Sequence, residues 1–405
     1  MMKKFNSNII VFIAVMIFII WGFNNDYFTE IKVAVKGLCK SVYASKSDSI
    51  SNFTGSIDSI STESLRYHDS LMNIDSLKKR ISNTRIIEKE DTVLVKTDND
   101  SLVEPQEYVL PDEWIHETVD AVYDLQKFSQ QNSARFLYVA MTGKGYDAAL
   151  PKNVKDYSEQ NYDNFIEGMR SKDVCVLDLK NEFLVDGKLP EEIFFKTDHH
   201  WTPRVAFEAT GIICQKLKSE YGFDYNTEYI DIKNYNIKMY NEWFLGSYGK
   251  KVGESYVGAD DFDIITPKFE TNLTEKQPIK NQIKTGSFEE TVMDMNNVNR
   301  KDYYNLNSYA AYSGGDFRLQ IIKNDLNPNG KKILIVRDSF ACAVTPFLSL
   351  QTAELHIVDI RDREWYVGDK INVYDYIEEI KPNYVIVLYQ YSAKLSDVAG
   401  RYNFK

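Results

Sequence analysis

The sequence predicts an α/β fold, a doubly wound, mostly parallel sheet with a long inserted subdomain. Short, almost continuously apolar runs alternate along the chain with segments whose apolar residues recur at helical spacing. The runs lack the apolar–polar alternation of a strand with one wet face, so we expect helices to cover both faces of the sheet. The chain has 405 residues, 43% of them hydrophobic, which is enough for a packed core of this kind.

The predicted elements begin after residue 105. Pro111 and Asp112 open a first helix, because apolar residues then recur on one helix face over 114–128. Thr202 and Pro203, a cap and a first-turn proline, precede another helix. Including this one, the helices predicted after the first are 158–170, 205–217, 341–350 and 373–380. The predicted strands are 136–141, 174–179, 332–336, 355–358 and 384–388.

Two segments depart from this alternation. Residues 221–330 are rich in Tyr, Asn, Asp and Gly and show no clear period. They are too long for a plain loop, so we expect an inserted lid or small β-rich subdomain within a domain that spans 106–405. Residues 41–105 are rich in Ser, Asp, Asn and Lys and hold only sparse Ile and Leu, so we expect residues 26–105 to form a stalk or linker, partly helical or disordered.

The N-terminus indicates export. Lys3 and Lys4 precede the segment 9–23, which is almost wholly apolar, holds no charge and is typical of a signal peptide or a membrane anchor. No small-residue cleavage site follows directly, which favours an uncleaved anchor within residues 1–25. The positive-inside rule then keeps the two lysines in the cytoplasm and places the rest of the chain outside the membrane.

Composition narrows the class of partner. The formal net charge of −11 argues against a nucleic acid, because phosphate binding needs clustered Lys and Arg. No cofactor is predicted, since the chain has no P-loop and no G-x-G-x-x-G after a strand. The four cysteines have no metal-ligand spacing, and Cys175 and Cys214 fall in apolar patterns as core residues. The 27 tyrosines and 22 phenylalanines fit either ordinary core and rim positions or a carbohydrate-facing surface.

Two of only five histidines stand side by side in residues 197–201, Thr-Asp-His-His-Trp. Asp198 and His200 are two residues apart, so in an extended segment both side chains point the same way. The carboxylate would then orient the imidazole and stabilise its cation, as acid–base catalysis requires. A metal site is the alternative, with Asp178 or Asp359 as further ligands, although no spacing such as H-x-x-x-H supports it.

A second segment follows the predicted strand 332–336. Ser339 begins the next helix at the carboxyl end of that strand, where functional residues of parallel sheets gather. Its hydroxyl would be exposed on a sharp turn, above backbone N–H groups that are free to bind an oxyanion. The structural alternative makes Ser339 a helix cap and Asp338 a turn residue. An acid, an imidazole and a serine hydroxyl form a nucleophilic acyl-transfer site if the fold brings the two segments together.

The residues around both segments resemble a known family. Residues 195–202, Phe-Lys-Thr-Asp-His-His-Trp-Thr, resemble the motif that names the bacterial DHHW proteins. Further segments with counterparts in that family are 244–250, 309–316, 333–340, 346–348 and 359–361. The resemblance spans about residues 106–395. DHHW proteins are similar to the SGNH-hydrolase-like domains of alginate O-acetylation proteins, in which the Asp-x-His motif precedes the serine.

The resemblance implies a role for each site residue. Ser339 would be the nucleophile, His200 the general base and acid, and Asp198 the residue that orients His200. Besides the backbone N–H of Ser339, the residues proposed to bind the oxyanion or the substrate are Phe340, Gly314, Gly315, Trp201, His199 and Arg337. The chain departs from the family pattern at two positions: Arg337 replaces the small residue usual in SGNH enzymes, and Cys342 stands where many DHHW proteins carry Asn.

These inferences predict a membrane-anchored, extracytoplasmic acyltransferase that passes an acetyl group through Ser339 to a cell-surface or exported polysaccharide. The resemblance implies that a multi-span membrane acyltransferase supplies the acetyl group. Three alternatives stay open. They are an esterase that passes the acyl group to water, a non-catalytic glycan-binding or assembly protein that uses Trp201 and the tyrosines as a platform, and a metal-assisted hydrolase at Asp198 and His200.

Overall fold

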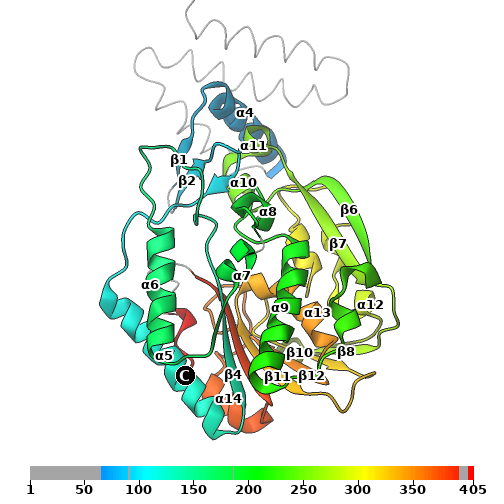
Figure 1. The fold of residues 1–405 in the computed structure, drawn as a ribbon. Helices are drawn as coiled ribbons and strands as arrows, with labels where there is room; N and C mark the ends of the chain where they lie inside the picture. Colours follow the sequence, from blue (N-terminus) through cyan, green and yellow to red (C-terminus); the bar gives the residue numbers. More distant parts are fainter. Residues whose placement is uncertain (1–64, 90–91, 186, 392–399) are drawn as a thin grey trace, which may run out of the picture. The chain divides into compact units, whose positions relative to one another are not determined.

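The computed structural model describes residues 65–89, 92–185, 187–391 and 400–405 (Figure 1). The chain divides after His68, and all three sheets belong to the second unit, residues 69–405. The predicted anchor and the first part of the predicted stalk, residues 1–64, lie outside the described residues. Within the described ranges, no helix is both long enough and apolar enough to cross a bilayer.

An eight-stranded mixed sheet forms the centre of this unit (Figure 1). Its strands lie in the order β5 (Val176–Asp178), β4 (Arg135–Met141), β13 (Tyr384–Gln390), β11 (Lys332–Arg337), β12 (Glu354–Val358), β10 (Leu319–Asn324), β8 (Leu273–Gln277) and β9 (Gln282–Gly286). The first five pair in parallel and the last three antiparallel. The five parallel strands are those that the apolar runs predict, so the α/β fold class is confirmed.

Helices cover both faces of the parallel strands. Helices α5 (Asp112–Gln131), α6 (Ser158–Ser171) and α14 (Val373–Ile380) pack with one set of strand side chains, and α7 (Leu179–Val185), α9 (Pro203–Tyr221) and α13 (Thr345–Ser349) with the other. Strand β4 shows why the strands are apolar throughout. Phe136 and Tyr138 lie in the first core and Leu137 and Val139 in the second, all essentially unexposed. Each such buried side chain stabilises the fold by about 1.5–3 kcal/mol.

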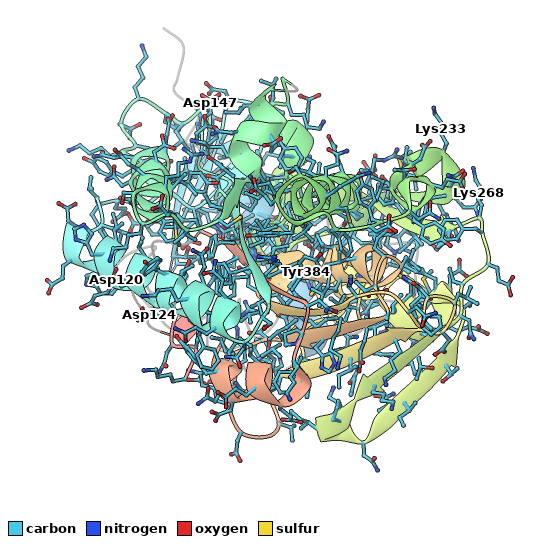
Figure 2. All side chains as sticks on the ribbon, turned by 60° about the horizontal axis from the view of Figure 1, so that its bottom comes forward. Asp120, Asp124, Asp147, Lys233, Lys268 and Tyr384 are labelled. Atoms are coloured by element: carbon cyan, nitrogen blue, oxygen red, sulfur yellow. The ribbon has the colours of Figure 1, made fainter. Side chains whose placement is uncertain are left out.

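Helix α5 is amphipathic, as its spacing predicts. Val119 and Val122 are buried toward the sheet, whereas Asp120 and Asp124 lie on the exposed outer face of the helix (Figure 2). Asp112 and Glu113 lie in its first turn, where their negative charges interact favourably with the positive end of the helix dipole.

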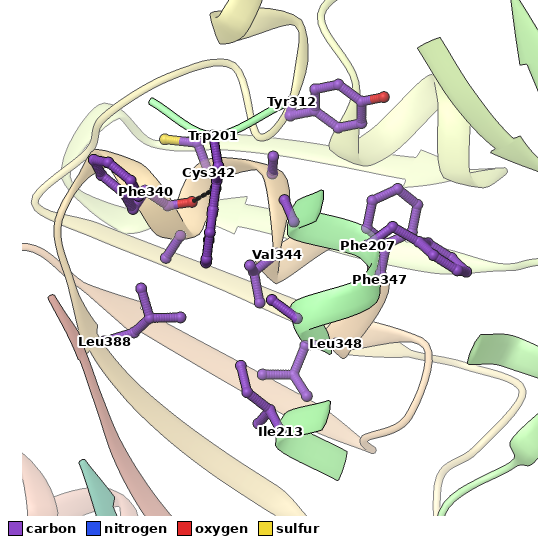
Figure 3. Close-up of a cluster of buried hydrophobic side chains, with 14 of the residues drawn as sticks. Trp201, Phe207, Ile213, Tyr312, Phe340, Cys342, Val344, Phe347, Leu348 and Leu388 are labelled. Carbon is purple, nitrogen blue, oxygen red and sulfur yellow. Dashed lines mark hydrogen bonds between the residues drawn. The ribbon is translucent and has the colours of Figure 1, made fainter. Parts of the chain in front are cut away.

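Helix α9 carries the chain away from the Asp-His-His-Trp segment. Thr202 caps its N-terminus by accepting from the Val205 N–H, Pro203 occupies the first turn, and Gly222 ends it in the left-handed conformation at φ 69°. Its inner face packs against α13, where the Phe207 and Phe347 rings meet edge to face at 5.0 Å (Figure 3). This packing fixes the point at which the His200 segment enters the core.

Residues 221–330 differ from the expected insert, because they supply β8, β9 and β10 to the edge of the main sheet. Strand β8 buries alternate side chains, Leu273, Glu275 and Gln277. Two of these are polar: Gln277 Nε2 donates to Glu275 Oε1 at 2.9 Å, and Gln320 Nε2 of β10 donates to the same oxygen at 2.6 Å. The two-residue period is therefore invisible to a search for apolar runs. The rest of the segment forms a β6–β7 hairpin (Tyr235–Phe244 and Asp260–Pro267) and short helices.

Short helices fill the remaining connections. They are α8 (Pro190–Ile193), η2 (Thr227–Ile230), η3 (Ile232–Asn234), α10 (Ser247–Val252), α11 (Glu254–Val257), η4 (Pro278–Lys280), α12 (Phe288–Val292), η5 (Met295–Asn297), η6 (Ser308–Ala311) and η7 (Ser339–Ala343). The predicted helix over 341–350 is thus two short pieces, η7 and α13.

The folded unit also begins earlier than the predicted boundary at residue 106. Helix α4 (Leu65–Ile81) is followed by a three-stranded antiparallel sheet of β1 (Ile86–Lys89), β2 (Thr92–Lys96) and β3 (Leu102–Val103). Leu94 and Leu102 pack there with Val252 and Tyr256. Residues 69–105 are therefore not a stalk. The few apolar residues of β2 are enough to form a strand because residues 245–257 cover them.

Candidate active site

The two predicted segments meet at the carboxyl edge of the parallel strands. Strand β11 ends at Arg337, and after Asp338 the chain enters η7 at Ser339. Residues 195–201 form a tight loop between α8 and α9, closed by a bridge between Phe194 and Trp201. The loop is further held by the Phe195 N–H, which donates to the His200 carbonyl at 3.1 Å.

Ser339, His200 and Asp198 form one chain of hydrogen bonds. His200 Nε2 lies 2.8 Å from Ser339 Oγ, and His200 Nδ1 lies 2.5 Å from Asp198 Oδ1. The same carboxylate oxygen accepts from the His200 backbone N–H at 2.9 Å. Asp198 and His200 are buried, whereas Ser339 is partly exposed. In this geometry His200 can take the hydroxyl proton while Asp198 holds the ring in the required tautomer.

The surroundings keep Asp198 charged. Burial raises the pKa of its carboxyl group, but the facing rings of His199 and His200 and the hydrogen bonds it accepts lower that pKa more, to well below its usual range. His199 lies beside this pair, with its ring centroid 3.9 Å from that of His200 and its Nδ1 3.0 Å from Ser247 Oγ. Desolvation and the neighbouring His200 lower the pKa of His199, so its partly exposed ring is neutral at pH 7.

A segment from the β6–β7 hairpin supports the carboxylate. The Ser247 N–H donates to Asp198 Oδ2 at 2.5 Å, and the Gly246 N–H donates to Thr197 Oγ1 at 2.9 Å. A Cβ on Gly246 would lie 2.2 Å from Asp198 Cβ, so only glycine permits this approach. Sequence reasoning noticed residues 244–250 only as part of a resemblance, and their backbone contacts give no sequence signal beyond the glycines.

Two charged side chains that sequence reasoning missed hold the loop in place. Lys144, in the loop after β4, is buried and donates to the carbonyls of Phe195, Lys196 (2.7 Å) and Asp198 (3.1 Å). Desolvation lowers the pKa of Lys144 to about 7, although Asp260 and Asp198 oppose this shift. A buried lysine with three carbonyl partners has no local sequence pattern that would mark it.

Asp260, at the start of β7, binds the same loop from the other side. It accepts from the backbone N–H groups of Lys196 at 2.7 Å and Thr197 at 2.8 Å, and from Thr197 Oγ1 at 2.5 Å. Strand β3 adds one more bond, from the Leu102 N–H to the Lys196 carbonyl at 2.9 Å. Buried backbone groups that lose such partners cost about 1–3 kcal/mol each. The loop that carries Asp198 and His200 is therefore fixed by several distant segments.

Trp201 lies in the core below the site. Its side chain is unexposed, and its Nε1–H donates to the Phe340 carbonyl at 3.0 Å (Figure 3) and to Tyr309 Oη at 3.1 Å. This corrects the prediction that Trp201 contacts a glycan, because a ring without exposed surface cannot stack on a sugar. Tyr309 in turn stacks on the His200 ring, with centroids 4.1 Å apart and planes at 19°. Trp201 thus links the His200 loop to the Ser339 turn.

The predicted oxyanion donors are only partly brought together. The Phe340 N–H donates to Asp338 Oδ1 at 3.0 Å, so it already has a partner in this structure. For the Ser339 N–H, by contrast, the hydrogen bonds among the described residues include none, and it stays the local candidate. Gly314 and Gly315 have φ values of 68° and 98°. The Gly315 carbonyl accepts from Arg337 Nη2 at 3.1 Å, which places this turn against Arg337.

Comparisons with known proteins agree with this architecture. Residues 117–229 match the family model described as SGNH hydrolase-like domain, acetyltransferase AlgX. Bacillus cereus PatB1 is similar in structure, with a TM-score of 0.60 and 22% identity over 74% of this chain and 96% of PatB1. Over residues 117–229 the chain is thus similar to an SGNH hydrolase-like domain, and its fold is shared with PatB1. No curated protein sequence matches the chain.

Two further solved structures are similar. PatB1 with a sulfonyl adduct gives a TM-score of 0.60 and 21% identity over 76% of this chain and 95% of that one. A DHHW family protein from Eubacterium siraeum gives 0.55 and 18% over 75% of this chain and 92% of its own. The family model therefore supports the resemblance over a range that includes residues 195–202, and the DHHW protein supports it at the level of the fold.

Arg337, a predicted substrate contact, lies inside a buried ion network instead. Its guanidinium is unexposed and pairs with Asp316, which also lies 3.2 Å from Arg361 Nη2. Asp359 completes the network, 2.5 Å from Arg361 Nη2. The two arginines lower the pKa of Asp316 against the effect of burial, so the network stays charged. A buried position of this kind leaves Arg337 no surface for substrate and gives it a part in fixing the end of β11.

Cys342 belongs to the same network. Its Sγ lies 3.3 Å from both Arg337 Nη1 and Asp316 Oδ1. Burial raises the pKa of the thiol, so it is protonated and can donate to the carboxylate. Cys342 therefore packs beneath the Ser339 turn.

Asp338 and the C-terminal residues brace the nucleophile turn. Asp338 Oδ2 accepts from the Gln390 N–H and from Arg401 Nη1, both at 2.9 Å. Arg401 also donates to the Gln390 carbonyl at 2.8 Å. Ser339 is thus held between the end of β13 and the last residues of the chain.

The metal alternative has three donor residues but not the ligands nominated for it. Within the described ranges, Asp198, His199 and His200 offer atoms that all lie within 4.8 Å of one another. Asp178 instead binds Tyr162 and Arg170, and Asp359 binds Arg361. Both ring nitrogens of His200 already face Asp198 and Ser339. Three protein ligands and a water would suffice for a catalytic zinc, so a metal held by these three residues would have to displace one of the two hydrogen bonds of the His200 ring.

Proposed function

We propose that this protein is a serine-dependent O-acetyltransferase that acetylates hydroxyl groups of an exported or cell-surface polysaccharide. The observation that carries the proposal is the continuous chain from Ser339 Oγ through His200 to Asp198, at the carboxyl edge of a parallel sheet. The match to an acetyltransferase-type SGNH hydrolase-like domain supports acetyl transfer as the chemistry.

The reaction follows from the positions of three side chains. Ser339 Oγ attacks the carbonyl carbon of an acetyl donor while its proton passes to His200 Nε2, and that proton then leaves with the donor's leaving group. The Ser339 N–H at the start of η7 would stabilise the oxyanion. In the second half, His200 takes the proton of an acceptor hydroxyl as that oxygen attacks the acetyl-serine, and then returns a proton to Ser339 Oγ. If water is the acceptor, the same site acts as an esterase.

The cellular setting is part of the proposal. The apolar segment 9–23 after Lys3 and Lys4 would anchor the chain and place the catalytic domain outside the cytoplasm. An acetyl donor would then have to cross the membrane, which a multi-span acyltransferase partner would accomplish. Segment 9–23 lies outside the described residues, so its sequence alone supports this arrangement.

A Ser339→Ala strain tests the proposal. We expect O-acetyl groups on the surface polysaccharide to disappear, as measured by base release of acetate or by NMR. The purified full chain should react with a sulfonyl fluoride at Ser339, a probe suggested by the sulfonyl adduct of the similar PatB1 structure. His200→Ala should abolish the same labelling, because the hydroxyl loses its base.

Each alternative has its own outcome. Unchanged polysaccharide acetylation in the Ser339→Ala strain would refute the catalytic proposal and favour a glycan-binding role. Activity that survives Ser339→Ala but not a chelator would indicate a metal at Asp198 and His200. Acetate release without transfer to any acceptor hydroxyl would make the protein an esterase.

A further inference from the structure

A shallow surface cleft lies away from Ser339 but opens at the same edge of the sheet. It is lined by the end of β8 and η4, by the start of β10, and by the loop after β12. Strands β11, β12 and β8 end at this edge, where antiparallel β10 begins. With strands about 5 Å apart, three strand spacings place the far side of the cleft roughly 15 Å from the strand that carries Ser339. We call this hollow the aromatic cleft, after Phe317, Trp365 and Tyr366 in its lining.

The cleft is mechanically tied to the nucleophile turn. Asp316, one of its lining residues, pairs with Arg337, and Arg337 stands two residues before Ser339. Arg361, at the base of the loop after β12, pairs with the same aspartate. One ion network therefore sets the positions of the cleft wall and of the serine turn together.

Exposed apolar side chains mark the cleft as a binding surface. Trp365 is 64% exposed and Val367 61% exposed, although both are large apolar residues. Together with Ile279 on η4 they form an apolar rim around the aromatic lining. Exposed apolar groups clustered at one hollow are typical of ligand sites, and a flat indole ring suits the C–H face of a pyranose.

The polar atoms below the rim specify the kind of ligand. Arg318 and Gln277 line the cleft and are 8% and 4% exposed. Within the described residues, Arg318 Nε and Gln277 Oε1 have no hydrogen-bond partner. The amide of Gln277 cannot be turned around, because its Nε2 donates to the buried Glu275 carboxylate at 2.9 Å. The cleft thus offers one unpaired donor and one unpaired acceptor.

Ligand hydroxyl groups can satisfy both atoms, since a hydroxyl can accept from the arginine and can also donate to the amide oxygen. A phosphate or carboxylate would satisfy only the arginine and would leave the Gln277 oxygen facing an anion. Neither atom is exposed to solvent in this conformation, so a ligand hydroxyl reaches them only after side chains of the cleft lining move. These features together favour a polyhydroxy ring over an anion.

We propose that the aromatic cleft binds a pyranose residue of the acceptor polysaccharide, a short distance along the chain from the sugar that is acetylated at Ser339. This inference rests on the proposed function, and it adds the location and chemistry of acceptor binding. Trp365 stacks on the apolar face of the ring, while Arg318 and Gln277 bind its hydroxyl edge. The cleft makes a polymer a better acceptor than a single sugar.

The test compares Trp365→Ala with Tyr108→Ala, which removes another exposed aromatic ring, 47% exposed and outside the cleft lining. The probe is surface polysaccharide from the producing cells, freed of O-acetyl groups by mild base. Binding is measured to full-length protein that carries Ser339→Ala, so that no turnover occurs. We expect Trp365→Ala to weaken binding about tenfold and Tyr108→Ala to leave it unchanged.

A kinetic arm uses proteins with Ser339 intact and p-nitrophenyl acetate as donor. Trp365→Ala should raise the KM for the polysaccharide acceptor about tenfold and leave hydrolysis of p-nitrophenyl acetate at the wild-type rate. The proposal would be overturned if the Ser339→Ala protein bound the polysaccharide equally well with and without the additional Trp365→Ala substitution. Displacement of the polysaccharide by inorganic phosphate would overturn the assignment to hydroxyl groups.

The two proposals fail separately. If Ser339→Ala leaves acetylation in cells unchanged but Trp365→Ala still weakens binding, the cleft stands as a glycan site and the catalytic function fails. If Ser339→Ala abolishes acetylation but Trp365→Ala changes neither binding nor KM, the catalytic function stands and the cleft proposal fails.

Discussion

Gly246→Ala should damage catalysis without touching any catalytic side chain. The methyl group would lie 2.2 Å from Asp198 Cβ and 2.6 Å from Asp198 Oδ2. Carbon atoms in contact normally stay about 3.5–4.0 Å apart, so one backbone must move by more than about 1 Å. The new methyl group would meet the Cβ of Asp198, which belongs to a buried loop bound by Lys144 and Asp260. Rotation of a flexible side chain therefore cannot relieve the clash.

The expected magnitude follows from that displacement. Movement of Asp198 relative to Ser247 breaks the 2.5 Å bond to the carboxylate and shifts the His200 ring from Ser339 Oγ. A misplacement of about 1 Å lowers rate by roughly 100-fold in a preorganised site. Overpacking of this kind also costs about 1–3 kcal/mol of stability. The effect on kcat should therefore exceed what the change in stability alone would produce at 25 °C.

The assay is hydrolysis of p-nitrophenyl acetate and the rate of sulfonyl fluoride labelling, with thermal unfolding followed by circular dichroism. Gly211→Ala is the matched control. A Cβ at Gly211 would meet only the Ile230 side chain at 3.6 Å, an ordinary contact, and alanine suits the interior of α9. A folded Gly246→Ala protein with wild-type kcat and labelling rate would refute the argument that this approach positions Asp198.

Three further predictions concern the same loop. Asp198→Asn should lower kcat by about 10⁴-fold with the fold intact, because His200 loses the partner that fixes its tautomer; a normal rate of p-nitrophenyl acetate hydrolysis would contradict this. Trp201→Phe should cost about 1–3 kcal/mol in denaturant unfolding, since it removes a buried hydrogen bond and part of a fully buried ring and leaves Tyr309 Oη as the remaining side-chain donor to the Phe340 carbonyl. An unchanged midpoint would count against the Trp201 bond. The pKa of Lys144 is about 7 in the folded protein, below its value in the unfolded chain. Between pH 7 and 10 the unfolded chain therefore binds more protons, and the free energy of unfolding of the wild-type protein increases as the pH rises. Lys144→Met should lack that gain, and parallel stability curves for the two proteins would disprove the assignment.

The parallel half of the fold could be predicted because its physics is local. Strands buried on both faces need continuous apolar runs, and helix α9 carries its own cap, proline and C-terminal glycine. Strand β8 could not be found in this way, since the buried Glu275 depends on Gln277 in the same strand, on Gln320 in β10 and on Lys284 in β9. Whether such a polar pair lies inside is decided by tertiary contacts.

The candidate site shows the same division. Asp198, His200 and Ser339 are visible in the sequence, because a catalytic chain needs rare side chains at defined strand ends. Lys144 and Asp260 bind backbone groups, and backbone groups carry no sequence identity, so nothing at residues 195–197 identifies these partners. The prediction that Trp201 contacts a glycan was wrong for a related reason. A large aromatic residue next to a site can stack on a ligand at the surface or pack in the core, and the sequence does not tell which because it does not give the burial of the side chain.

The contacts that hold residues 195–201 also order events during synthesis. Asp198 and His200 leave the ribosome well before Gly246, Asp260 and Ser339. A growing chain that ends before residue 260 already contains Asp198 and His200. It still lacks the Asp260 carboxylate that binds Lys196 and Thr197, and it lacks Ser339. Contacts this distant in sequence form late, because long loops must close first. If Ser339 is the nucleophile, a chain that ends before residue 339 would be unable to react with a donor, and labelling at Ser339 would report that the loop, its supports and the serine are all present.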